Sequence, residues 1–181
     1  TGKVESYLNN PKDSTSIPSS RVFSLYKASN GCIYVGTSAG FCCYNPEKNN
    51  FTRIGSFSSK GSAIIEDYFG RIWIGTSISG LYSYNVRTKK ISSYQRSDNS
   101  NSLTKNVITT LAIDSKKRLW IGTYGQGLCR YNDETDDFTR YDHLKLPNKI
   151  ITSIIPKGDL LWISTNKGLA VYNPDTEYLK T

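Results

Sequence analysis

The sequence of 181 residues has no methionine and only one histidine. It has no basic segment followed by an apolar one, as a secretion signal would, and its apolar runs are too short to cross a bilayer as helices. The absent initiator methionine predicts that the chain is a piece of a longer protein. Apolar residues nevertheless make up 37% of the chain, which favours a packed core over disorder.

Histidine and cysteine are too few and too scattered to indicate a metal centre. Cys32, Cys42, Cys43 and Cys129 form no CxxC pair, and His143 lies far from all of them in the sequence. We therefore predict no metal and no cofactor. Adjacent Cys42 and Cys43 should point to opposite faces of a strand. The pattern favours buried free thiols, with a disulfide framework as the less favoured alternative because a chain of this length does not need one.

Acidic residues are under-represented, with 15 Asp and Glu against 23 Lys and Arg, giving a formal charge of +8. Such an excess favours anionic partners, namely sulfated or uronic glycans, nucleic acid or an acidic protein face. The basic residues are scattered and no RNP, zinc-finger or helix-turn-helix signature occurs, so we predict no nucleic-acid partner. The alternative is that a piece of a protein shows only part of the parent's charge pattern.

One phrase occurs four times in the sequence. The copies are CIYVGTSAGFCCYN from Cys32, RIWIGTSISGLYSYN from Arg71, RLWIGTYGQGLCRYN from Arg118 and LLWISTNKGLAVYN from Leu160. Aligned on the Gly or Ser before the Thr, they follow one another at intervals of 39, 47 and 42 residues. Periods of about 40 to 50 residues are typical of propeller blades and of helical arrays. The β-branched and aromatic runs, punctuated by Gly, Asn and Pro, favour the propeller.

One repeat divides into four predicted strands, at residues 107–113, 118–123, 127–132 and 137–142. Four antiparallel strands make one propeller blade. We therefore predict an all-β fold, a β-propeller segment of about four four-stranded antiparallel blades cut from a larger array. The predicted units are 1–20 (the last strand of a preceding blade, at residues 3–7, plus a linker), 21–59, 60–105, 106–147 and the truncated 148–181.

The repeated residues have architectural explanations. Trp73, Trp120, Trp162 and the equivalent Tyr34 are expected to pack between blades. The glycines at 36, 75 and 122 should leave room for a close neighbour, and those at 40, 80, 127 and 168 should adopt positive φ in turns.

The phrase WIGTxxxGLxxYN, followed by TxxFxxY and with DxxxSL before the next first strand, resembles the two-component regulator propeller repeat. The likeness covers essentially the whole chain, although the outer copies depart to IYVGT and LWIST. The resemblance implies the periplasmic sensor region of a Bacteroides-type hybrid histidine kinase that responds to oligosaccharides from complex glycans. The kinase and the membrane-bound parts would lie outside this chain, which would itself not be an enzyme.

Ligands of propellers usually meet the mouth of the central channel, where the loops before the first strands join those between the second and third strands. A Tyr or Gln beside Lys and Arg suits an anionic sugar through ring stacking and charge-assisted hydrogen bonds. The alternative is that these lysines are ordinary solvated loop residues. The predicted ligand-binding residues are Arg21, Lys60, Lys105, Tyr124, Gln126, Lys149, Asn166 and Lys167.

Three further hypotheses concern activity and partners. A propeller enzyme such as a glycan hydrolase or lyase would need paired carboxylates or a nucleophile with a base, and no catalytic residue is predicted. Asp133, Glu134, Asp136 and Asp137 cluster only in a predicted turn, His143 has no evident partner, and residues 67–73 resemble the structural Asp-box turn of sialidases.

A protein-binding scaffold is disfavoured because WD-repeat signatures are absent. Exposed outer blades predict association with the remaining blades or with another copy of the chain.

Overall fold

The computed structural model describes residue 2 and residues 4–181, and over these residues it is all-β, with no helix and hence none able to cross a membrane. Sixteen strands form four antiparallel sheets of four consecutive strands each. The predicted architecture of four four-stranded blades is confirmed.

Blade 1 contains β1 (Val22–Lys27), β2 (Ile33–Thr37), β3 (Gly40–Asn45) and β4 (Asn50–Gly55), and blade 2 contains β5 (Gly61–Glu66), β6 (Arg71–Thr76), β7 (Leu81–Asn85) and β8 (Ile91–Tyr94). Blade 3 contains β9 (Ile108–Ile113), β10 (Leu119–Thr123), β11 (Leu128–Asn132) and β12 (Asp137–Arg140), and blade 4 contains β13 (Ile151–Lys157), β14 (Leu160–Thr165), β15 (Gly168–Asn173) and β16 (Tyr178–Lys180).

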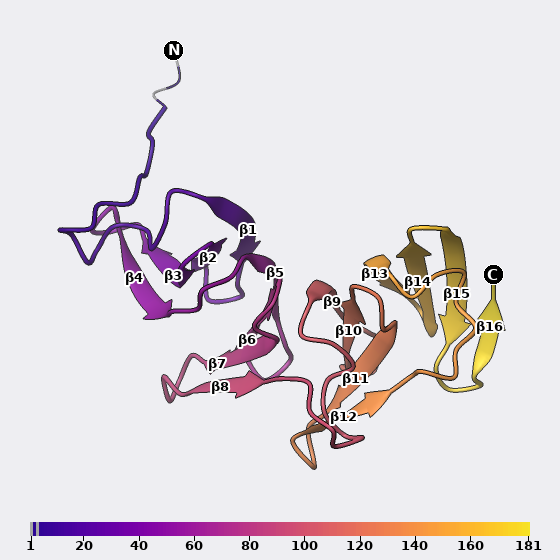
Figure 1. The fold of residues 1–181 in the computed structure, drawn as a ribbon. Helices are drawn as coiled ribbons and strands as arrows, with labels where there is room; N and C mark the ends of the chain where they lie inside the picture. The colour runs from indigo at the N-terminus through magenta and orange to yellow at the C-terminus, as the bar shows by residue number, and fades with distance from the viewer. Residues whose placement is uncertain (1, 3) are drawn as a thin grey trace.

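The blades stand side by side in an open arc, with first strands on the concave side and fourth strands on the convex side (Figure 1). The first strands contact one another in sequence, β1 with β5, β5 with β9 and β9 with β13. Because strands alternate in direction, the turns between second and third strands lie on the same side as the connections between blades. We call this side the loop face and the opposite side the hairpin face.

Aromatic side chains interlock successive blades. The Trp73 ring of blade 2 is fully buried, 4.6 Å from the ring of Tyr131 in blade 3. Trp120 of blade 3 is likewise buried, 6.5 Å from Tyr172 of blade 4. Trp162 of blade 4 has no blade against it and is 38% exposed. The predicted packing between blades is thus confirmed for Trp73 and Trp120. Trp162, on the outermost blade, stays partly exposed because no further blade covers it.

The repeated glycine before the Thr allows the next blade to approach closely. A Cβ added at Gly75 would lie 2.5 Å from Cγ2 of Ile108, and one at Gly122 would lie 2.7 Å from Cγ2 of Ile151. Both isoleucines begin the first strand of the following blade. Blade 4 has Ser164 at this position, where the hydroxyl shares a 2.8 Å hydrogen bond with that of Thr152. The glycine before the Thr is therefore needed only where another blade follows. The turn glycines at 40, 80, 127 and 168 have the predicted positive φ.

The cysteines correct part of the sequence-based expectation. Cys32 and Cys43 form a disulfide, with Cα atoms 6.2 Å apart. Cys43 pairs with Tyr34 across the hairpin, so Cys32, two residues earlier, lies diagonally opposite on the same face. Cys42, on the other face, and Cys129 are buried free thiols as predicted, and burial raises the pKa of each to about 12.

Residues 4–7 form no strand, which corrects the strand expected at 3–7, where Lys3 lies outside the described residues. No neighbouring strand is present among the described residues to pair with it. Tyr7 nevertheless packs on blade 1, and its hydroxyl donates a 2.6 Å hydrogen bond to Asn49. Tyr94 of blade 2 donates in the same way to Asp136 of blade 3, at 2.7 Å. Tyr7 therefore takes the side-chain position of a preceding blade's last tyrosine.

Candidate ligand-binding face and cavity

The eight predicted ligand-binding residues are all exposed, and the topology places them all on the loop face. Four precede first strands, namely Arg21, Lys60, Lys105 and Lys149. The other four, Tyr124, Gln126, Asn166 and Lys167, lie in or beside the turns between second and third strands. The structure thus brings residues from all four blades to one side of the arc.

Backbone hydrogen bonds join the loops of blades 2, 3 and 4, and we call the row of loops along the loop face the rim. In blade 3, the amide of Tyr124 donates to the carbonyl of Val107 in its own blade at 2.9 Å. The amide of Gly127 donates at 2.9 Å to the carbonyl of Lys149, which precedes the first strand of blade 4. The corresponding amide of blade 2 bonds to the loop of blade 3 at 3.0 Å. The loop backbone of blades 2 and 3 is therefore held at a set position relative to the next blade.

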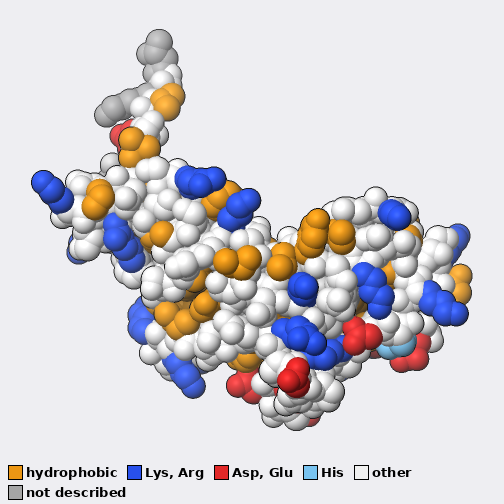
Figure 2. Space-filling model, viewed as in Figure 1, with side chains coloured by type: hydrophobic (Ala, Val, Ile, Leu, Met, Phe, Trp, Pro, Cys, Tyr) orange, Lys and Arg blue, Asp and Glu red, His pale blue; other side chains and the backbone are white. Residues whose placement is uncertain are grey.

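The side chains on this rim carry unneutralised positive charge. Lys149 donates a hydrogen bond to the backbone carbonyl of Asp142 at 2.8 Å, and Lys60 lies over the ring of Phe23, 5.0 Å from its centroid. No ion pair joins any of the eight to a carboxylate among the described residues. Lys and Arg are spread along the arc rather than gathered in one patch in the view of Figure 2.

Phe23 is an exposed aromatic side chain near the loop face that the sequence pattern did not predict. Every first strand has a β-bulge at the same register position, occupied by Phe23, Ser62, Thr109 and Thr152 in turn. Phe23 is 37% exposed, although a phenylalanine in a predicted strand reads as a core residue. Bulges turn a side chain away from the ladder pattern and are common beside functional sites. The bulge depends on pairing between strands, which the sequence pattern does not show.

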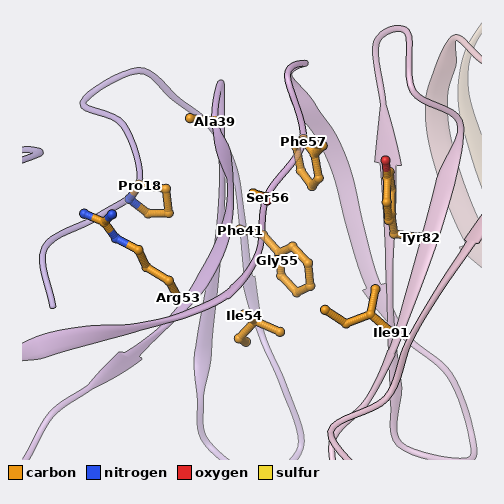
Figure 3. Close-up of a pocket in the computed structure, with 10 residues that line it drawn as sticks. All are labelled: Pro18, Ala39, Phe41, Arg53, Ile54, Gly55, Ser56, Phe57, Tyr82 and Ile91. Carbon is orange, nitrogen blue, oxygen red and sulfur yellow. The ribbon is translucent and has the colours of Figure 1, made fainter. Parts of the chain in front are cut away.

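A cavity of about 680 Å³ opens between blades 1 and 2. Figure 3 shows Tyr82 and Ile91 of blade 2 facing Phe41 of blade 1, whereas Arg53 and Pro18 lie beyond β4, on the side of blade 1 away from blade 2. The cavity extends to Ala39 in the loop-face turn, to Gly55 at the end of β4 and to Ser56 and Phe57 in the connection between the blades, so it lies towards the loop face. None of the eight predicted residues lines it.

Arg53 at this cavity anchors the chain segment before blade 1. Its Nε donates to the carbonyl of Ser16 at 3.0 Å, and its Nη2 donates to the carbonyl of Asp13 at 3.1 Å. Arg140 of blade 3 holds the connection before that blade in the same manner, with Nε donating to the carbonyl of Ser102 at 2.8 Å. Both arginines therefore fasten a long connecting segment against the outer strand of their blade.

The acidic residues that cluster in the predicted turn lie between β11 and β12 and at the start of β12, and three of them accept hydrogen bonds or form an ion pair. Asp136 accepts hydrogen bonds from the hydroxyls of Tyr94 and Tyr131, each at 2.7 Å. Burial, reinforced by the bond to Asp136, raises the pKa of both tyrosines. Asp133 pairs with Arg71 of blade 2. His143 is exposed, and no group of three or more potential metal ligands occurs among the described residues.

The turn that resembles an Asp box is a structural device. The buried Asp67 carboxylate accepts hydrogen bonds from the amides of Phe69 and Arg71, each at 2.9 Å. Its other oxygen accepts from Nε1 of Trp73 at 2.7 Å. One carboxylate therefore closes the turn and fixes the tryptophan between the blades, and Asp114 makes the corresponding bonds in blade 3.

Comparison with known proteins agrees with this geometry. The sequence model of the two-component regulator propeller family matches residues 16–39 and 102–125, each running from a long connection to a loop-face turn. The chain contains two-component regulator propeller repeats. The two matched repeats are those whose connection is held by an arginine.

The propeller repeats are shared with bacterial regulators. Histidine kinase P4 of Formosa agariphila is 34% identical over 94 residues, which cover 46% of this chain and 7% of the kinase. The extracellular domain of BT4673 from B. thetaiotaomicron superposes with a TM-score of 0.70 at 27% identity, over 86% of this chain and 22% of that one. The extracellular domain assigned to the hybrid two-component system BT3049 of the same bacterium has a TM-score of 0.77 at 22% identity, over 97% of this chain and 26% of that one. At this low identity the likeness shows the fold alone. This chain therefore spans about a quarter or less of these proteins.

Proposed function

We propose that this regulator propeller segment belongs to the ligand-sensing part of a hybrid two-component sensor, outside the cytoplasm. The observation that carries the proposal is the loop face, where four repeats present exposed polar side chains on one rim, whose loops are hydrogen-bonded to one another from blade 2 to blade 4. Loops held in place by a rigid scaffold are common binding sites. The similarity to the BT4673 extracellular domain and to a histidine kinase supports the signalling context.

The periplasm is the compartment we propose for this segment. Its Cys32–Cys43 disulfide is compatible with an oxidising compartment, where such bonds persist. The membrane-spanning part and the kinase would belong to other regions of the parent protein. Signalling would then require that ligand occupancy on the propeller changes its contacts with those regions.

We propose binding rather than catalysis for this segment. A glycan hydrolase needs two carboxyl groups that flank the substrate, one of which acts as an acid. Here Asp133, Asp136 and Asp137 are engaged by Arg71, by two tyrosines and by Asn132, respectively. Propeller folds do support enzymes, so the assignment depends on these side chains and not on the fold.

The proposed ligand of the loop face is an oligosaccharide derived from a complex glycan, contacted by the eight residues predicted above. A basic rim with Tyr124 exposed suits a sugar that carries carboxylate or sulfate groups. We expect the chain to bind such oligosaccharides on a glycan array. Replacing Lys149 or Tyr124 by alanine should weaken that binding by about tenfold, as titration calorimetry would show, because a charged hydrogen bond or a stacking contact is lost.

The matched control for these variants is Lys48→Ala, which removes an exposed lysine from the hairpin face. It should leave the affinity unchanged within error. Equal affinity of the Lys149→Ala, Tyr124→Ala and unmodified chains would contradict the proposed contact face.

We further propose that the outer face of blade 4 is covered in solution by the remaining blades or by another copy of this chain. Ile155, Trp162 and Leu169 are 62%, 38% and 49% exposed there and line one apolar depression. In sedimentation velocity the isolated chain should associate at micromolar concentration, and Ile155→Glu should shift it to monomer because the charge would be desolvated. Ile78→Glu, on a loop-face turn, is the control and should still associate. A monomeric unmodified chain would refute self-association.

A further inference from the structure

A side-chain hydrogen bond joins the first strands of neighbouring blades near the loop face. At the bulge of blade 2, the hydroxyl of Ser62 donates to the carbonyl of Ile108 in blade 3 at 2.7 Å. Gly61 of blade 2 has the register position of Ile108, and its carbonyl accepts a 2.7 Å hydrogen bond from the hydroxyl of Ser24 in blade 1. Ser24 is the residue after the bulge. Blade 1 therefore makes the same link from the neighbouring position of its first strand.

This difference leaves the bulge of blade 1 without a role in the link. The bulge residue is Phe23, whereas the other three blades have serine or threonine there. Where blade 1 has Ser24, blade 2 has Ala63, which carries no hydroxyl. The two differences compensate each other, because the link is kept while an aromatic ring replaces a hydroxyl at the bulge. Sites where a sequence departs from its own structural pattern are the expected places for function.

The side chain of Lys60 covers part of the Phe23 ring. Its Nζ lies 5.0 Å from the ring centroid, where an ammonium is attracted by the aromatic face. The backbone of Lys60 is fixed, because its carbonyl accepts a 3.0 Å hydrogen bond from the amide of Ser77 and its amide donates to the Ser77 hydroxyl at 3.2 Å. The ammonium pairs with no carboxylate among the described residues, so its charge is available to a ligand.

An exposed aromatic ring with a cation over it matches one residue of an acidic saccharide. The C–H face of a pyranose ring is apolar and packs on an aromatic face. A carboxylate or sulfate group accepts charge-assisted hydrogen bonds from an ammonium. A neutral sugar that stacks on the covered face of Phe23 must displace Lys60 and offers it no charged partner. An acidic sugar does offer one, so this pair of side chains favours acidic sugars over neutral ones.

We propose that Phe23 and Lys60 form one subsite of the loop face, in which a uronate or a sulfated sugar stacks on Phe23 and its acidic group binds the Lys60 ammonium. On binding, Lys60 exchanges the aromatic ring for the acidic group of the ligand. This inference rests on the proposed oligosaccharide ligand. It adds the aromatic platform to the eight predicted residues and names the side chain that sets the preference for acidic sugars.

The decisive variant is Phe23→Ser, which gives blade 1 the bulge residue of blade 2. The full chain is first screened on an array of uronate-containing, sulfated and neutral oligosaccharides that includes trigalacturonic acid and a chondroitin sulfate tetrasaccharide. Each acidic hit is then titrated by calorimetry beside its uncharged counterpart, the methyl ester or the desulfated sugar. We expect Phe23→Ser to weaken binding of both by about tenfold, because each loses the stacking contact. The thermal midpoint should change little, since the repeat accepts a serine at this position.

Tyr68→Ser is the matched control. Tyr68 is 65% exposed in the β5–β6 turn on the hairpin face, where blades 1 and 3 have Ser29 and Ser115. This variant also replaces an exposed aromatic side chain by the serine of other repeats, and it should leave the affinity for every saccharide unchanged within error.

Lys60→Ala tests the same subsite without changing the strand. It should weaken the acidic saccharide by about tenfold but leave its uncharged counterpart unchanged or bound more tightly, because the ring is uncovered. Equal weakening of both sugars would overturn the role of Lys60.

Comparison with Lys149→Ala separates this inference from the proposed function. Binding that Phe23→Ser leaves intact but Lys149→Ala weakens would overturn the subsite while leaving the proposed function in place. Binding of neutral sugars alone would overturn the acidic class. Binding that neither variant weakens, or an array that detects no saccharide, would overturn both the subsite and the proposed contact of the loop face with an oligosaccharide.

Discussion

Trp120→Ala should lower the free energy of unfolding by about 4 kcal/mol, because it empties the space between blades 3 and 4. The indole is fully buried, 5.0 Å from the ring of Tyr141, and its Nε1 donates a 2.8 Å hydrogen bond to Asp114. Removing it creates a cavity and leaves a buried carboxylate oxygen with one donor fewer. Urea unfolding followed by circular dichroism measures the change without depending on tryptophan fluorescence.

Trp162→Ala is the matched control, since Trp162 occupies the same position of the repeat in blade 4. This side chain is 38% exposed because no blade packs against it. Lys157 stands where blade 3 has Asp114, so this indole lacks the corresponding carboxylate partner. We expect a loss of about 1 kcal/mol, the usual scale for a partly exposed side chain. Equal losses for the two variants would show that the aromatic interlock between blades does not stabilise the arc.

Asp67→Ala should cost about 3 kcal/mol, because it removes one partner of a buried ion pair and leaves several donors unsatisfied. The Asp67 side chain is 4% exposed and accepts bonds from two backbone amides, from Trp73 and from Arg71. Loss of these bonds should free the β5–β6 turn as well as the tryptophan. Hydrogen exchange of the Phe69 and Arg71 amides would report the turn, alongside urea unfolding for the whole domain.

Asp133→Ala tests the other carboxylate on the same arginine. Asp133 lies in the next blade and its side chain is 39% exposed, so its ion pair with Arg71 is screened by solvent. The expected loss is about 0.5 kcal/mol, with the protection of the turn amides retained. A loss as large as that of Asp67→Ala would mean that the link between blades, and not the buried turn, carries the stabilisation.

The repeated phrase predicted the strands well because its pattern is set by local chemistry. The predicted strand at 118–123 corresponds to β10 (Leu119–Thr123), and that at 127–132 to β11 (Leu128–Asn132). Alternation of β-branched and aromatic residues favours extended backbone, and Gly80 or Gly127 ends each turn where φ must be positive. Such preferences act within a few residues, so they are readable without knowing the neighbours.

The disulfide and the cavity could not be predicted in this way. Cys32 and Cys43 meet because the β2–β3 register brings them diagonally together, and an odd change in register would separate them. The cavity is lined by Ile54 and Ile91, which come from different blades. Each isoleucine alone is an ordinary strand residue, so no single position marks the space.

The sequence by itself determined the all-β class, the repeat of four strands and the loops that share one face, because each follows from short-range backbone preferences and from counting. Only the tertiary structure decided which cysteines pair, which tryptophan stays exposed and where the blades fail to fill the space between them. The pairing of Cys32 with Cys43 depends on the register of one hairpin. The other two outcomes depend on distances between residues about 40 positions apart in neighbouring blades, and side-chain packing sets such distances.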